Sequence, residues 1–119
     1  MRVILVGALL MSASSLNGTQ RLAIKVTPAV AIAPANLRVR AVVQANPENR
    51  ALEIVAESPD FYRSSRIQLD GEHAPLANVI DFRDLPGGTY EVTASLIDAD
   101  NRRTMVRQGV TIIGVGFDR

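Results

Sequence analysis

The stretch from Leu85 to Asp98 constrains the fold of this chain more than any other. It opens with the turn residues Pro86, Gly87 and Gly88 and continues as an alternation of apolar and polar side chains. Successive side chains of a strand point to opposite faces of a sheet, so alternation marks a half-buried strand. The apolar face consists of Tyr90, Val92, Ala94 and Leu96, and the polar face of Glu91, Thr93 and Ser95. The stretch therefore predicts a tight turn that leads into a strand.

Tyr90 stands at the start of that strand, where a buried phenol can donate a hydrogen bond to backbone a few residues upstream. The pattern F-x-x-L-P-x-G-x-Y-x-V over residues 82–92 resembles the corner of immunoglobulin-like and fibronectin type III-like domains, including the exported bacterial type. The resemblance implies an all-β, immunoglobulin-like antiparallel β-sandwich of about seven strands, with Tyr90, Leu85 and Gly88 as structural residues. The chain lacks the tryptophan and the cysteine pair of antibody-type domains. The alternative is that Tyr90 is only a core aromatic of another all-β fold.

The amino terminus has the pattern of a signal peptide. One positive charge at Arg2 precedes an apolar run from Val3 to Met11 and the small residues 12–15. We therefore expect a signal peptide over residues 1–15 and one β-sandwich domain over residues 16–119. The apolar run is too short to span a bilayer comfortably. No stable membrane span is expected once the signal peptide has been removed. The predicted location is the periplasm or the external medium. A buried strand over residues 3–6 is the alternative.

Short alternating segments separated by Gly, Pro, Asn and Asp continue through the rest of the chain. Residues 29–34 are apolar and flanked by prolines, so we expect them to run extended along a sheet edge or to cross between sheets. The other expected strands run over residues 22–27, 37–43, 52–56, 61–69 and 78–82, before the strand that contains Tyr90 and a final strand after Arg102.

The last hairpin has two possible registers. A loop that ends at Arg102 pairs Tyr90 with Val110, whereas a loop shorter by one residue places Arg103 in the core. We prefer the first register, because a slip of one residue moves every side chain to the other face. Its consequence is that Gln108 points inward and needs a hydrogen-bonding partner.

The composition of the chain provides few residues suited to catalysis, metal binding or nucleic-acid binding. Thirteen basic and twelve acidic residues nearly cancel, so no global field attracts nucleic acid. The chain has no cysteine, and its single histidine, His73, lies in the turn-like segment 70–73. Asp98 and Asp100 resemble a fragment of a calcium loop, but the downstream Gly and Glu of an EF-hand are missing. We therefore predict no catalytic residues, no metal site and no cofactor.

Arginines are the commonest charged residues, and Arg38 and Arg40 share the outer face of their expected strand. A polyanion can bind such a face. The alternative is a solvated face with cross-strand ion pairs, such as Glu91 with Arg107, and the balanced net charge favours it.

The remaining candidate is the segment Phe61, Tyr62 and Arg63, which holds two of the five aromatic residues. Neighbouring side chains of an extended segment face opposite ways, so one ring can enter the core while the other stays near solvent. An exposed aromatic beside Arg is typical of a partner-binding surface. The hypothesis is a non-enzymatic exported interaction or accessory module that binds another protein or an envelope or extracellular glycan. The alternatives are a carbohydrate-binding module and a structural subunit that assembles through its edge strands.

Overall fold

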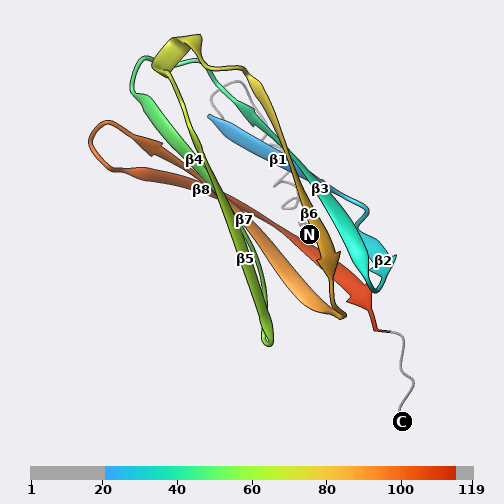
Figure 1. Ribbon diagram of the computed structural model, residues 1–119. Helices are drawn as coiled ribbons and strands as arrows, with labels where there is room; N and C mark the ends of the chain where they lie inside the picture. The colour runs from blue at the N-terminus through green and yellow to red at the C-terminus, as the bar shows by residue number, and fades with distance from the viewer. Residues whose placement is uncertain (1–20, 115–119) are drawn as a thin grey trace, which may run out of the picture.

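The computed structural model describes residues 21–114, which form eight β-strands and one short 3-10 helix (Figure 1). The predicted signal peptide, residues 1–15, lies outside the described residues. No helix within residues 21–114 is long and apolar enough to cross a membrane. The elements are β1 (Leu22–Thr27), β2 (Val30–Ile32), β3 (Ala35–Val43), β4 (Asn49–Ser58), β5 (Phe61–Gln68), η2 (Gly71–His73), β6 (Ala77–Leu85), β7 (Gly88–Asp98) and β8 (Arg103–Ile113).

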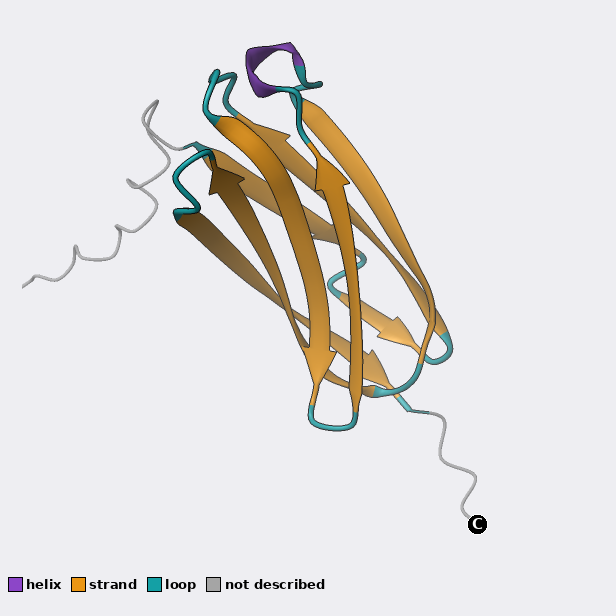
Figure 2. Ribbon diagram, turned by 60° about the vertical axis from the view of Figure 1, so that its left-hand side comes forward, coloured by secondary structure: helices purple, strands orange, loops and turns teal. Residues whose placement is uncertain are grey.

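The strands form two sheets that pack face to face (Figures 1 and 2). The smaller sheet has the order β1-β3-β6, and the larger has the order β2-β8-β7-β4-β5. One continuous core fills the space between them, and its largest members include Tyr90, Leu37, Leu52 and Ile54. Every second residue of β3 is buried, because the alternating apolar side chains of this strand all point into the core. The prediction of an all-β fold is thus confirmed at the level of two sheets.

The strand count is one higher than predicted, because residues 30–32 form a strand of their own. After β1, the chain leaves the three-stranded sheet at Pro28, and β2 pairs in parallel with β8 of the other sheet. Both expectations for residues 29–34 are therefore confirmed: the chain crosses between the sheets, and β2 then runs extended along an edge of the larger sheet. Pro28 and Pro34 flank this short strand, since a proline has no N–H to donate to a ladder.

The turn before β7 forms the expected hydrogen bond. Tyr90 is buried, and its hydroxyl donates to the carbonyl oxygen of Pro86 over 2.7 Å. Gly87 lies against the end of β8, where a Cβ on Gly87 would come within 2.7 Å of the Gly114 Cα. A side chain at Gly87 would therefore push the two backbone segments apart.

The hairpin of β7 and β8 has the preferred register, with Tyr90 opposite Val110 and Gln108 opposite Val92. The inward-facing Gln108 has a partner on the other sheet. Its Nε2 donates to the carbonyl oxygen of Val26 over 3.0 Å, and its Oε1 accepts from the Val26 N–H over 3.0 Å. Val26 belongs to β1, an edge strand of the three-stranded sheet. Gln108 therefore occupies the position that a neighbouring strand would take and joins the two sheets on this side.

Candidate functional site

The predicted segment Phe61, Tyr62 and Arg63 begins β5, and its three side chains divide between the two faces. Phe61 packs edge-on against Tyr90, with ring centroids 6.4 Å apart. The Arg63 guanidinium lies 5.1 Å from the centroid of the Phe61 ring and donates to the carbonyl oxygen of Arg83 in β6 over 2.9 Å. Tyr62 points outward and is 61% exposed. Phe61 and Arg63 therefore have contacts within the fold, and Tyr62 is the accessible member.

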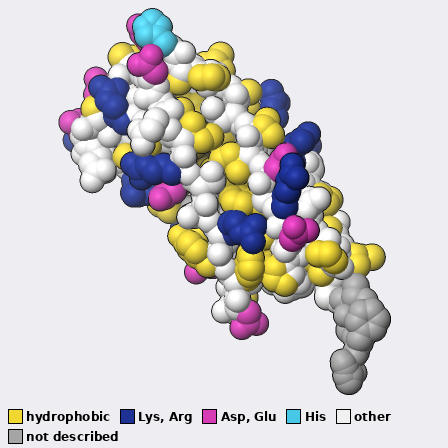
Figure 3. All heavy atoms as spheres, in the orientation of Figure 1, with side chains coloured by type: hydrophobic (Ala, Val, Ile, Leu, Met, Phe, Trp, Pro, Cys, Tyr) yellow, Lys and Arg dark blue, Asp and Glu magenta, His cyan; other side chains and the backbone are white. Residues whose placement is uncertain are grey.

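These contacts lie where the edge strands of the two sheets, β5 and β6, come together. The order of the sheets puts β5 and β6 on the side opposite the Gln108 contact. Figure 3 shows hydrophobic side chains along the surface between the two sheets, with basic side chains to either side. The Arg63 bridge thus links the sheets on this side as Gln108 does on the other.

Tyr62 begins a row of residues that crosses four strands on the outer face of the larger sheet. The register places Tyr62 of β5 opposite Glu57 of β4, Glu57 opposite Glu91 of β7, and Glu91 opposite Gly109 of β8. All four residues are exposed. Because neighbouring strands lie 4.7–4.9 Å apart, the row is roughly 14 Å long. We call the surface formed by these four residues the acidic groove.

Two carboxylates stand next to one another in the acidic groove. Glu57 and Glu91 are directly opposite one another, an arrangement in which like charges destabilise a sheet. In the described part of the chain, neither has a Lys or Arg nitrogen within 4.0 Å. The expected pair of Glu91 with Arg107 does not form, since Arg107 stands opposite Thr93. The groove therefore keeps its negative charge.

Gly109 leaves the floor of the groove open. A hollow of about 470 Å³ lies beside it, lined by Glu57, Glu91, Thr89 and Pro59 among others but not by Tyr62. A Cβ built on Gly109 would meet only the Tyr90 carbonyl oxygen, at 4.0 Å. The fold thus has room for a side chain at this position.

Sequence reasoning identified Tyr62 but missed the other three residues of the groove. The outward positions of Glu57 and Glu91 follow from alternation along each strand. That the two strands are neighbours, and in which register, depends on pairing between distant segments. No local signal in the sequence carries that pairing.

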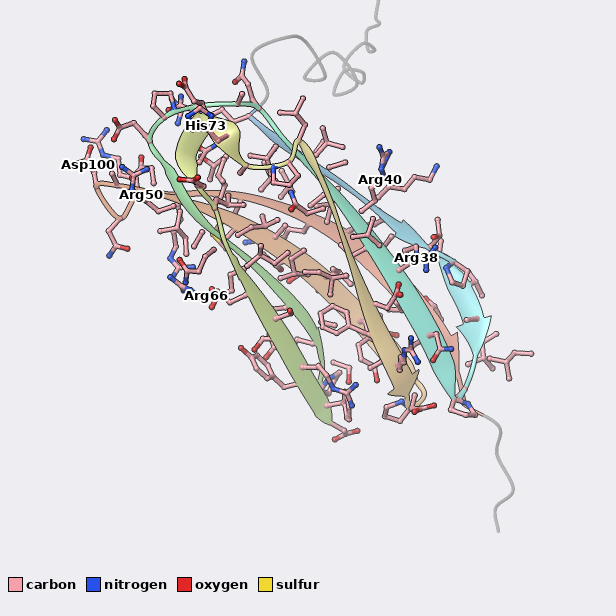
Figure 4. The ribbon with its side chains drawn as sticks, turned by 45° about the horizontal axis from the view of Figure 1, so that its top comes forward. Arg38, Arg40, Arg50, Arg66, His73 and Asp100 are labelled. Carbon is pink, nitrogen blue, oxygen red and sulfur yellow. The ribbon has the colours of Figure 1, made fainter. Side chains whose placement is uncertain are left out.

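The other candidates from the sequence lie at the loop end of the molecule, where Figure 4 labels Arg50, His73 and Asp100. His73 is exposed in η2, as expected of a solvated turn. The Asp98 carboxylate accepts hydrogen bonds from the N–H groups of Asp100 and Arg102, so it stabilises its own loop. Residues 21–114 contain no group of three or more His, Cys, Asp or Glu side chains arranged to hold a metal ion.

The predicted basic face lies on the outer side of the three-stranded sheet (Figure 4). Arg38 binds Asp81 of β6 through two hydrogen bonds, of 2.9 and 3.3 Å. The hydrogen bond from Arg38 lowers the pKa of the Asp81 carboxyl, and the same contact raises the pKa of Arg38. Arg38 therefore has the cross-strand partner that the alternative of a solvated face predicts. Arg40 stands opposite Lys25 on one side and Val79 on the other.

No family model and no curated protein matches the chain. Solved structures match its fold. One is the superoxide reductase (neelaredoxin) from Ignicoccus hospitalis, with a TM-score of 0.63 and 14% identity over 78% of this chain and 80% of that one. The chain shares its fold with superoxide reductases. A superoxide reductase (neelaredoxin) from Archaeoglobus fulgidus matches with a TM-score of 0.56 and 14% identity over 76% and 88% of the two chains.

A third match is a family 76 glycoside hydrolase from a bovine Bacteroides thetaiotaomicron strain. Its TM-score is 0.54, with 18% identity over 76% of this chain and 20% of that chain. The match therefore concerns one part of a much longer enzyme. At these identities the comparisons show a common fold and nothing of the activity.

The comparisons contradict the predicted membership of the immunoglobulin-like and fibronectin type III-like domains. The motif of residues 82–92 is local, and a buried tyrosine after a Pro-Gly turn can begin a strand in more than one all-β fold. The prediction of a non-enzymatic immunoglobulin-like accessory module is contradicted as well, because it rested on that membership and the structures that share this fold include enzymes, the superoxide reductases. Neither of its two alternatives, a carbohydrate-binding module or an edge-strand subunit, fits the comparisons better.

Superoxide reduction itself requires a group that gives up one electron, such as a transition-metal ion held by imidazole, thiolate or carboxylate ligands. The chain has no cysteine, and His73 is its only histidine. The described residues include no cluster of three His, Cys, Asp or Glu side chains that could hold a metal ion. These residues do not fit such a metal centre, so no redox step follows from the likeness of fold.

Proposed function

We propose that the acidic groove binds a cationic group, and that this group is a lysine or arginine side chain of a partner protein. The observation that carries the proposal is the row of Tyr62, Glu57, Glu91 and Gly109 across four strands. It combines an exposed aromatic ring, two carboxylates that have no ion-pairing partner among residues 21–114, and an open floor.

Each member of the row has a chemical part in such binding. A cation above the face of a tyrosine ring is attracted by the ring's quadrupole. Carboxylates accept short charge-assisted hydrogen bonds from ammonium or guanidinium groups. Gly109 exposes the backbone of β8, on which the aliphatic stem of a long side chain can lie. A bound cation also relieves the repulsion between Glu57 and Glu91.

The sequence pattern of residues 1–15 supports export, so we propose that the partner is met in the periplasm or outside the cell. N-terminal sequencing of protein from those fractions tests this part of the proposal. A mature chain that still begins at Met1 would contradict it.

The binding experiment uses the full chain, labelled with ¹⁵N, and two short peptides that differ only by acetylation of their lysines. Acetylation removes the positive charge. We expect the lysine peptide to shift amide signals of the acidic groove and the acetylated peptide to leave them unchanged. Replacing one carboxylate, as in Glu57→Gln, removes a charge-assisted hydrogen bond and should weaken binding about tenfold.

Gly109→Val provides a test that separates binding from folding. The position has room for a side chain, and β-branched residues favour strands, so the variant should be at least as stable as the wild type. Its side chain should nevertheless occupy the part of the hollow next to Glu91 and weaken binding. Met105→Ala, on the same strand but outside the groove, is the matched control. Equal shifts with both peptides, or full binding by Gly109→Val, would refute the proposal, and so would binding of an oligosaccharide panel without a response to lysine.

A further inference from the structure

Two apolar side chains are exposed together on the outer side of the three-stranded sheet. Val42 and Val79 are 42% and 53% exposed. Val42 of β3 is opposite Ala77, two residues before Val79 in β6, so the two lie at the same end of these strands. This end of the sheet is also where the chain enters β1 at residue 22, because Leu22 pairs with Val43.

Two cations border these apolar side chains. Lys25, Arg40 and Val79 form one row across β1, β3 and β6. Among residues 21–114, neither Lys25 nor Arg40 has a carboxylate oxygen within 4.0 Å, whereas the next row contains the Arg38 and Asp81 pair. In Figure 4, Arg40 projects away from the ribbon on the side of β3 that carries Arg38. We call Val42, Val79, Lys25 and Arg40 the basic apolar patch.

We propose that the basic apolar patch docks on the surface of a bilayer that contains anionic lipids. Apolar side chains enter the boundary between headgroups and acyl chains, and Lys and Arg side chains reach the headgroup phosphates. The patch supplies both kinds of side chain next to one another. Each cation near an anionic leaflet adds to the attraction, which decreases with salt.

The chemistry of the patch disfavours other partners. A second copy placed face to face would bring Lys25 and Arg40 against their own counterparts, and like charges repel. A single-stranded nucleic acid is usually held by stacking on aromatic rings, and the patch has none. Charge and apolarity together fit an anionic lipid surface.

The test uses the full chain with one cysteine introduced at Val79 and labelled with an environment-sensitive dye. The natural chain has no cysteine, so the label reports from one position. Met105→Cys is the matched control, because Met105 is 49% exposed and lies on the outer face of the other sheet. Vesicles of phosphatidylcholine alone are compared with vesicles that also contain phosphatidylglycerol. We expect a blue shift at position 79 only with phosphatidylglycerol, and a smaller or no shift at position 105.

Charge reversal tests the role of the two cations. We expect Lys25→Glu with Arg40→Glu to weaken vesicle binding by more than about tenfold. Arg66→Glu with Arg107→Glu changes the net charge equally on the outer face of the other sheet and should have little effect. Equal shifts at positions 79 and 105, or shifts that do not depend on phosphatidylglycerol, would overturn the proposal. A shift at position 79 that grows with protein concentration without vesicles would overturn it in favour of a second copy.

Discussion

Gln108 offers the sharpest test of how the two sheets are joined. Its side-chain amide both donates to and accepts from the backbone of Val26, with both distances at 3.0 Å. We compare two substitutions. Gln108→Leu removes both hydrogen bonds and keeps a side chain of similar length. Gln108→Glu keeps the acceptor for the Val26 N–H and places a second carboxylate oxygen against the Val26 carbonyl.

The expected magnitudes follow from these contacts. One hydrogen bond contributes about 1 kcal/mol net, so Gln108→Leu should lower the free energy of unfolding by about 2 kcal/mol, less what the added apolar burial returns. For a domain of this size, each kcal/mol corresponds to about 4 to 8 °C in Tm. Gln108→Glu should cost at least as much at neutral pH, because one bond is lost and two oxygens repel.

The pH dependence distinguishes the two variants. Protonation lets the introduced carboxyl donate to the Val26 carbonyl, so its pKa in the folded state should lie above the unfolded value of about 4.3. A pKa raised by folding means that the penalty is complete above the folded pKa and disappears as the pH falls through it. The stability difference between Gln108→Glu and wild type should therefore shrink in acid, whereas that of Gln108→Leu should not.

Urea denaturation of the three proteins at a series of pH values measures these differences. Comparison with wild type at each pH removes the contributions of all other titrating groups. A Gln108→Leu variant as stable as wild type would refute the idea that this amide joins the sheets. A deficit of Gln108→Glu that does not change with pH would show that the carboxyl does not face the Val26 carbonyl.

Two further predictions concern the buried tyrosine and the ion pair. Tyr90→Phe loses the 2.7 Å hydrogen bond to Pro86 and should lower the free energy of unfolding by about 1 kcal/mol. Tyr62→Phe, at the exposed tyrosine, should leave the free energy of unfolding unchanged. Equal effects of the two substitutions in urea denaturation would contradict a stabilising role for the Tyr90 hydrogen bond. Arg38 lowers the pKa of Asp81, so the stabilisation from the pair should be complete above the usual Asp pKa and be lost as the pH falls through the lower folded value. An NMR titration should show the Asp81 pKa rising in Arg38→Gln, and an unchanged titration would count against the ion pair.

Alternation along the chain was enough to predict most strands and their inward faces. In β3 the apolar residues recur at every second position, and their burial follows. In β7 the alternation holds up to Ala94, and residues 94–97 are all buried. The register of the last hairpin was also predictable, because only one choice keeps Arg103 out of the core. The fold family could not be predicted correctly, because the motif around Tyr90 is short and local.

The sequence by itself therefore determined the all-β character, the buried face of each strand and the need of Gln108 for a partner, since these depend on neighbours along the chain. Only the tertiary structure decided that the partner is Val26, 82 residues away, and that Tyr62, Glu57, Glu91 and Gly109 form one row. The same holds for the basic apolar patch. The reason is physical: pairing between distant strands is set by the packing of the whole core, and no local pattern specifies which outward side chains become neighbours.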